Sequence, residues 1–139
     1  MEVVPYDFTK VNLIVTSSTG QTYITGFSNN SSIDAERSSD KYTKHVGAKG
    51  DTTFAKNNDT SGTIKFKLKI DSPSNKVLNT LSQGDTTFDA QIVDGNDSTK
   101  SKVSSTDCII MKPATYSRGS EITDLEWTIG CPAISIEYD

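Results

Sequence analysis

Segment 61–82, SGTIKFKLKIDSPSNKVLNTLS, constrains the fold more than any other part of the chain. In its first half, apolar residues alternate with threonine or lysine, so that one face carries Ile64, Phe66, Leu68 and Ile70 and the other Thr63, Lys65, Lys67 and Lys69. An alternation with a period of two predicts a half-buried antiparallel strand. Three lysines on one face cannot be buried without partners, so this face must meet water or acidic groups.

A short helix over residues 73–82 is predicted to follow this strand. Ser72 is placed to cap it, and Pro73 would occupy the first helical position, where a missing N–H costs nothing. Val77, Leu78 and Leu81 give the helix one apolar stripe. The whole segment reads as scaffold, since it contains no group typical of catalysis.

The composition indicates a single thin β-domain. The chain has 139 residues, which suits one core, and only 33% of them are hydrophobic. So small an apolar share favours a sandwich or a partial barrel with many side chains facing outward. The net charge of −4 argues against a dedicated nucleic-acid binder, which normally presents a basic patch.

Further strands are predicted on both sides of segment 61–82. Alternating or β-rich runs occupy residues 10–16, 21–27, parts of 32–47, 86–93, 103–112, 121–129 and 132–138. We therefore expect a mainly β, antiparallel β-sandwich or partial barrel of about eight or nine strands with one short flanking helix, in a single domain spanning residues 1–139. Residues 1–8 are expected to form an arm or an edge segment. The Gly- and Asn-rich stretch 49–61 is expected to be a protruding loop.

The two cysteines and the N-terminal sequence indicate a protein made in the cytoplasm. Cys108 and Cys131 are the only cysteines, the first residues lack the pattern of a signal peptide, and no apolar run reaches membrane-spanning length. We expect two reduced, partly buried thiols and no membrane anchor. A disulfide remains the alternative, because both cysteines lie in predicted strands.

No metal or cofactor site is predicted. His45 is the only histidine and has no cysteine or carboxylate at a workable spacing, so it is expected to be a polar strand residue. Asp94, Asn96 and Ser98 imitate the start of a calcium loop, but the glycine and the bidentate glutamate that such a loop needs are missing. This stretch is interpreted as an Asp-Gly turn.

No catalytic constellation is predicted either. The pairs Asp34/Glu36 and Asp124/Glu126 could do acid–base work, but strand faces turned to solvent show the same pattern. Trp127 could stack on a sugar, but it shares its strand face with two aliphatic residues and is expected to pack in the core. We therefore expect no enzymatic activity.

Five segments, taken in order, resemble a known family. They are Asp40–Lys41, Val46–Gly50, Ser61–Ile64, Ser72–Asn75 with the predicted helix behind it, and the closing strand Ile134–Tyr138. Their order and spacing resemble the tail-tube proteins of contractile-tailed bacteriophages. The resemblance implies that six copies form a ring and that rings stack into a hollow tube inside a contractile sheath, with baseplate and tail-terminator proteins at its ends. It also implies a place in the virion tail, where DNA passes through without specific binding.

Two groups of residues are predicted to serve this assembly. Segment 41–60 is expected to be a protruding inter-subunit loop or hairpin, with contacts from Tyr42, His45, Lys49, Phe54 and Lys56. The lumen should be net negative so that DNA phosphates are not trapped. Its carboxylates are expected to come from Asp34, Glu36, Asp124 and Glu126, with the lysine face of strand 63–70 pointing elsewhere.

Two other functions remain open from the sequence. One is a monomeric β-sandwich module for virion decoration or adhesion. The other is the tube subunit of a phage-derived contractile bacteriocin or injection device. A monomer would stay solitary at high concentration, whereas a tube protein should give rings or fibres.

Overall fold

In the computed structural model, the long alternating strand lies in the centre of an antiparallel β-sandwich. The structure describes residues 5–18, 20–29 and 32–138. Strand β6 (Gly62–Lys69) has the predicted alternation, with Ile64, Phe66 and Leu68 buried and the three lysines exposed. The predicted fold class, a mainly β antiparallel sandwich or partial barrel with one short flanking helix, is confirmed, and the sheet does not close into a barrel.

The described residues form ten strands, one α-helix and one short 3-10 helix at Phe8–Lys10. The other strands are β1 (Val11–Ser17), β2 (Gly20–Ile24), β3 (Asp34–Arg37), β4 (Tyr42–Val46), β5 (Thr52–Lys56), β7 (Phe88–Asp94), β8 (Ser101–Lys112), β9 (Asp124–Cys131) and β10 (Ser135–Tyr138). The expected count of eight or nine was too low, because stretch 49–61 contains β5 rather than an irregular loop.

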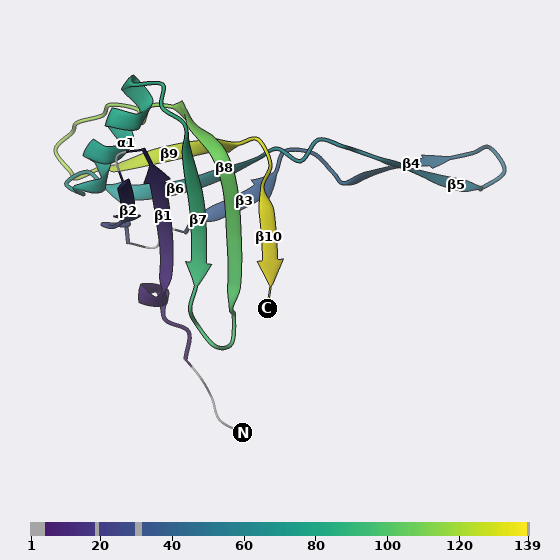
Figure 1. The fold of residues 1–139 in the computed structure, drawn as a ribbon, viewed down its shortest axis with the longest axis horizontal. Helices are drawn as coiled ribbons and strands as arrows, with labels where there is room; N and C mark the ends of the chain where they lie inside the picture. The colour runs from purple at the N-terminus through teal and green to yellow at the C-terminus, as the bar shows by residue number, and fades with distance from the viewer. Residues whose placement is uncertain (1–4, 19, 30–31, 139) are drawn as a thin grey trace.

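Strand β8 belongs to both layers of the sandwich. Its first part pairs with β7 and β10, in a layer ordered β2-β1-β7-β8-β10, and its last part pairs with β9, in a layer ordered β8-β9-β6-β3. Asp107, with a φ of 55°, lies near the point where β8 leaves β7 and joins β9; the register of β8 shifts against β7 here and against β9 between Ile110 and Lys112. Such irregularities bend a strand, and the two layers cross at a steep angle in Figure 1.

The core lies between these two layers and under the helix. Trp127 is 3% exposed and belongs to this core, which confirms core packing over a sugar-stacking role. The other fully buried members come from every layer: Leu13, Val15, Ile24, Ile64, Phe66, Leu68, Leu78, Phe88, Ala90, Cys108, Ile129 and Cys131. Burial of apolar area of this kind is the main stabilising contribution in a small domain.

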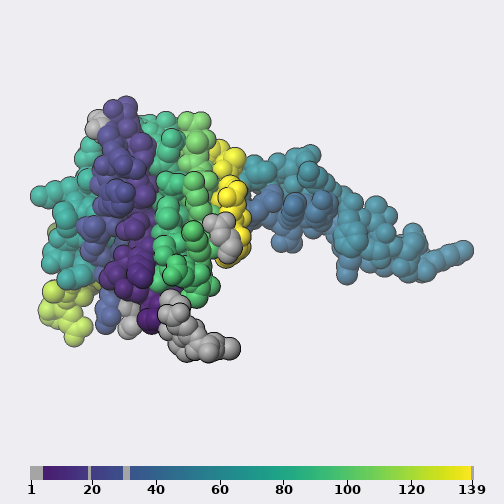
Figure 2. Space-filling model, turned by 60° about the horizontal axis from the view of Figure 1, so that its bottom comes forward, coloured from purple at the N-terminus to yellow at the C-terminus, as the bar shows by residue number. Residues whose placement is uncertain are grey.

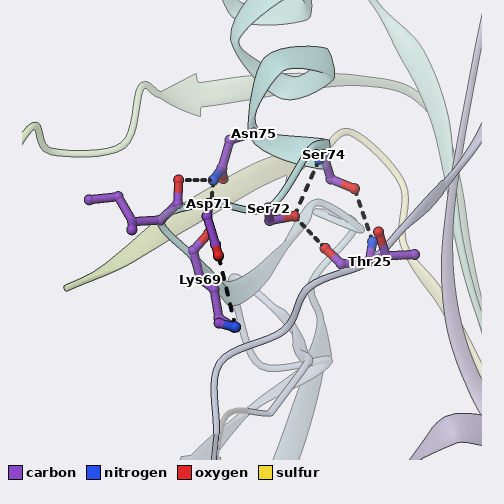
Figure 3. Close-up of polar contacts among 7 residues, drawn as sticks. Thr25, Lys69, Asp71, Ser72, Ser74 and Asn75 are labelled. Carbon is purple, nitrogen blue, oxygen red and sulfur yellow. Dashed lines mark hydrogen bonds and ion pairs between the residues drawn. The ribbon is translucent and has the colours of Figure 1, made fainter. Parts of the chain in front are cut away.

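Helix α1 (Ser74–Gln83) closes one end of the sandwich and begins one residue later than predicted (Figure 1). Ser72 is not its N-cap, because Pro73 takes that position and offers no side-chain bond. The Ser72 hydroxyl nevertheless accepts a hydrogen bond from the N–H of Ser74 and donates one to the carbonyl oxygen of Thr25 (Figure 3). The Ser74 hydroxyl in turn accepts from the N–H of Thr25 at 2.9 Å, so the helix start is tied to the end of β2.

The Asp-Gly turn between β7 and β8 anchors the beginning of the described chain. Asn96 is 1% exposed; its side-chain oxygen accepts from the N–H of Asp7 at 2.9 Å, and its amide donates to the carbonyl oxygen of Asp7 at 3.0 Å. The N–H of Asn96 donates to Asp94 at 2.9 Å. The residues that imitate a calcium loop therefore serve a structural turn, as the sequence suggested.

Candidate assembly surfaces

A two-stranded arm leaves the body of the protein between β3 and β6. Strands β4 and β5 pair only with each other, in the register Tyr42↔Lys56 to Val46↔Thr52, and the arm projects far from the sandwich (Figure 1; Figure 2). Every residue of both strands is exposed. Segment 41–60 thus protrudes as a hairpin, one of the two forms expected for it.

The five residues predicted to make inter-subunit contacts all lie on this arm, but on different sides. Tyr42, Phe54 and Lys56 share one face of the hairpin, since residues opposite or two apart in paired strands point the same way. His45 lies on the other face, and Lys49 lies in the turn that joins the strands. The structure therefore brings Tyr42, Phe54 and Lys56 together on one face and places His45 and Lys49 elsewhere on the arm.

A polar clasp at the base of the arm was not foreseen from the sequence. Asp59 accepts hydrogen bonds from the N–H of Ser61 at 3.0 Å, from the Ser61 hydroxyl at 2.6 Å and from the Ser39 hydroxyl at 3.2 Å. The Arg37 guanidinium donates to the carbonyl oxygen of Asp59 at 2.6 Å. The N–H of Asn57 donates to the carbonyl oxygen of Lys41 at 2.8 Å and closes the hairpin base.

The clasp holds the Asp59 carboxylate in its charged form. Hydrogen bonds from the Ser61 hydroxyl and the Ser61 N–H lower the pKa of Asp59, with smaller contributions from Ser39 and Arg37. The sequence signal was the Asp-x-Ser spacing at 59–61, which commonly forms such a turn.

The outer face of the β3-β6-β9 sheet mixes both signs of charge. Lys65 of β6 lies opposite Asp34 of β3, while Lys67 and Lys69 lie opposite Glu126 and Asp124 of β9. Directly paired residues in an antiparallel sheet point to the same face, and all of these side chains are exposed. Glu36 of β3 follows on the same face, opposite Thr63.

The expectation that the lysines point away from the four carboxylates is therefore wrong. The faces of strands far apart in the sequence depend on which strands pair and in what register, and neither follows from the alternation within each strand. Lys69 and Asp71 form the one ion pair found in the described part of the chain, at 3.9 Å (Figure 3). The lysines and carboxylates that lie opposite one another are therefore cross-strand neighbours but do not form ion pairs.

Across residues 5–18, 20–29 and 32–138, no group of three or more histidine, cysteine, aspartate or glutamate side chains is placed to hold a metal ion. None of the helices in the same residues is long and apolar enough to cross a membrane.

Fold and surfaces together define a structural protein: a small β-sandwich with open sheet edges and a long exposed arm. A sequence-family model identifies the group further. Residues 3–138 match the model of the bacteriophage PhiTE tail tube protein, so the chain belongs to that family and is a structural subunit of a phage tail tube. No curated protein matches the sequence.

Solved structures of contractile injection systems share the fold. The tube-terminating cap of the anti-feeding prophage is 13% identical, with a TM-score of 0.54 over 100% of this chain and 95% of that one. A chain in the sheath-tube complex of the PVC extracellular contractile injection system is 12% identical, with a TM-score of 0.53 over 97% of this chain and 93% of that one. Its sheath/tube terminator is 11% identical, with a TM-score of 0.56 over 99% of both chains.

Proposed function

We propose that six copies of this tube protein form a ring, and that the rings stack into a hollow tube through which phage DNA passes. The observation that carries the proposal is the arm, because all residues of β4 and β5 are exposed in a single copy. An isolated two-stranded hairpin is marginally stable in water. A neighbouring copy that covers the arm would supply the missing contacts.

Open sheet edges support the same assembly. Among the described residues, β3 pairs only with β6, and the last part of β8 pairs only with β9. Unpaired edges of this kind invite strand addition, and head-to-tail pairing that closes on itself gives a ring. Pairing of β3 with the end of β8 in the next copy would satisfy both edges at once.

We assign the outer face of the β3-β6-β9 sheet to the lumen. Its other face is occupied by the core, so the charged side is the one free to meet a channel. Strands β3, β6 and β9 carry four carboxylates on this face, Asp34, Glu36, Asp124 and Glu126, against three lysines, and Lys112 at the end of β8, opposite Thr128, makes the two kinds of charge equal in number. An interleaved surface without a net positive charge would offer phosphates no continuous row of cations to bind.

The remaining partners follow from the family and from the related structures. A tube of this kind would lie inside a contractile sheath and end at a baseplate and a terminator, the components named in the similar assemblies. The chain would be synthesised in the host cytoplasm and would catalyse no reaction, acting only as tube wall.

Electron microscopy of the purified chain tests the proposal. Wild-type protein at high concentration should give rings or tubes by negative stain. A variant in which residues 42–56 are replaced by a short Gly-Ser turn should form neither rings nor tubes, because the arm is gone. Its body should still fold, because Lys41 and Asn57 can still close the base of the hairpin. Its circular dichroism spectrum and thermal midpoint should show a folded sandwich.

A matched control keeps this test specific. Tyr116→Ala removes another exposed aromatic side chain outside the arm and should leave tube formation unchanged. Tubes of normal length from the arm-less variant would overturn the role of the arm. A wild-type protein that stays monomeric at every concentration would instead favour the decoration or adhesion module.

A second candidate is the tube of a phage-derived injection device, which the fold shared with the anti-feeding prophage and PVC structures favours. Such a tube uses the same assembly but delivers no phage genome. Purified particles that contain this chain and a sheath but no DNA-filled head would support the device.

A further inference from the structure

Charge is divided unevenly between the arm and the rest of the chain. Segment 41–56 contains Lys41, Lys44, Lys49 and Lys56 against Asp51 alone, so the arm has a net charge of +3. The rest of the chain therefore has a net charge of −7, which together with the +3 of the arm gives the chain's net charge of −4, with histidine neutral. A cationic arm on an anionic body favours contact between the arm of one copy and the body of another.

One face of the arm is apolar as well as cationic. Tyr42, Val46 and Phe54 lie on it and are 49%, 59% and 64% exposed, with Lys44 and Lys56 beside them. The opposite face carries Thr43, His45, Thr53 and Ala55. Because three large apolar side chains are exposed together on one side only, that side is the one that a partner would cover.

The body has an apolar groove at the open end of the sandwich, where the β1-β7-β8-β10 layer extends past β3. Its volume is about 450 Å³. One residue from each of the four strands of that layer lines the floor of the groove: Val11, Ile92, Val103 and Ile136. Ile33 and Ala35, from the segment around β3, line its wall. The aromatic rings of Tyr6, Phe8 and Tyr138 lie at its border.

Among the described residues that line this groove, Asp94 is the one with a charged side chain. Hydrogen bonds from the Thr99 hydroxyl and from Asn96 keep its pKa below the ordinary value, so the carboxylate stays anionic at neutral pH. A groove with apolar walls and one fixed anion complements an apolar face flanked by lysines.

Three other grooves formed by the described residues fit the arm less well. The one beside α1 is apolar, but Lys76 and Arg118 line it and would repel the lysines of the arm. The one along the end of β2 has no charged residue among its described lining residues. The one over β7 and β8 contains Asp89, but the apolar side chains among its described lining residues are only those of Ala90 and Ala133.

We propose that the apolar face of the arm, formed by Tyr42, Val46 and Phe54, docks in the groove of a second copy of this chain, with its flanking lysines directed at Asp94. This inference rests on the proposed tube assembly and names the surface that receives the arm. It also gives the assembly an electrostatic component, which salt should weaken.

Cysteine cross-linking between two variants tests the contact in full-length protein. Phe54→Cys and Ile136→Cys are prepared separately, mixed under assembly conditions and oxidised with diamide, a two-electron thiol oxidant. Two thiols then lose two protons and two electrons to form one disulfide between chains, and the diamide is reduced to the hydrazine. Tryptic mass spectrometry identifies the joined peptides, while the native cysteines are buried.

Two matched pairs serve as controls. Thr53→Cys with Ile136→Cys moves the thiol of the arm to its opposite face, and Phe54→Cys with Ile122→Cys moves the thiol of the body to an exposed loop outside the groove. We expect Phe54→Cys with Ile136→Cys to cross-link at least about tenfold faster than either control pair, because docked sites have a high effective concentration. Ile136→Lys should in addition prevent tube formation, whereas Ile122→Lys should not.

The outcomes separate this inference from the proposed function. Wild-type tubes together with equal cross-linking in all three pairs would overturn the groove as the docking site and leave the tube assembly standing. Absence of wild-type tubes at any concentration would contradict the assembly itself. Tube formation by Ile136→Lys at wild-type yield would also overturn the groove assignment.

Discussion

Cys108 and Cys131 lie directly opposite each other across β8 and β9, with their sulfur atoms 3.8 Å apart and both side chains buried. The register Ile109↔Gly130 makes them the next pair along the two strands. The hydrogen bond between the two thiols lowers the pKa of Cys108 to about 7, and the same interaction, together with burial, raises the pKa of Cys131. Cys108 is therefore the more acidic thiol of the pair, while both side chains lie away from solvent.

Burial should dominate the reactivity of these thiols. In the folded protein we expect Ellman's reagent to modify neither cysteine at an appreciable rate, despite the low pKa of Cys108, because a reactive thiol must also be accessible. In denaturing guanidinium chloride both should react at once. The exposed arm variant Phe54→Cys supplies the positive control, since its added thiol should react in the folded state. Rapid modification of wild-type protein under native conditions would contradict the packing described for this pair.

The charged face of the β3-β6-β9 sheet gives a second prediction. Glu126→Lys would set two ammonium groups opposite each other, at positions 67 and 126, and should lower the free energy of unfolding by roughly 0.5–1 kcal/mol. Glu126→Gln, which removes the charge without reversing it, should cost less. Urea unfolding of the dilute protein measures both. The prediction fails if the two variants are equally stable or if the reversal stabilises the fold.

This face also shows how far the sequence could lead. The alternation in β6 predicts which of its residues are buried, because burial follows from a pattern within one strand. That Lys67 and Glu126 share a face depends on the pairing of β6 with β9, which are separated by more than fifty residues in the chain. No pattern inside either segment encodes that register, so lysines and carboxylates were expected on different surfaces.

The arm shows a different limit. Strand β5 contains Phe54 as its only large apolar residue, and all of its residues are exposed. Hydrophobic periodicity arises from burial, so a hairpin that leaves the body of its own chain carries little of it. Its protrusion was nevertheless predictable from the Gly- and Asn-rich composition of the stretch. The clasp around Asp59 that fixes its base required contacts between segments twenty residues apart.

A third prediction concerns Gly62, at the first position of β6. A Cβ atom there would clash with the carbonyl oxygen of Glu36 and come within 2.6 Å of a methyl group of Ile134. Gly62→Ala should therefore lower the free energy of unfolding by about 1–3 kcal/mol, since overpacking forces the neighbouring backbone to move. Gly119→Ala is the matched control, because a Cβ there meets no atom within 4 Å. Denaturant unfolding with an unchanged m-value would attribute the difference to stability, and equal midpoints for the two variants would contradict the close approach.

The last prediction uses the pH dependence of the turn that holds Asp94. The largest cause of its lowered pKa is the Thr99 hydroxyl, which donates to Asp94 at 2.6 Å, followed by the N–H of Asn96. A carboxyl whose pKa is lower in the folded state stabilises the protein above its unfolded pKa, and this contribution is lost as the pH falls through the folded value. Thr99→Val removes the hydroxyl while keeping the shape of the side chain.

The variant should therefore be less stable than wild type at neutral pH, and the difference in stability should narrow as the pH falls below 3.8, the ordinary pKa of an aspartate side chain. Urea midpoints of both proteins between neutral pH and the acid limit of the folded state measure it. Thr86→Val is the control, because the Thr86 hydroxyl donates only to a backbone carbonyl oxygen, that of Gly84, and its loss should be independent of pH. A gap for Thr99→Val that stays constant across this range would show that the hydroxyl stabilises the turn without acting through the charge of Asp94.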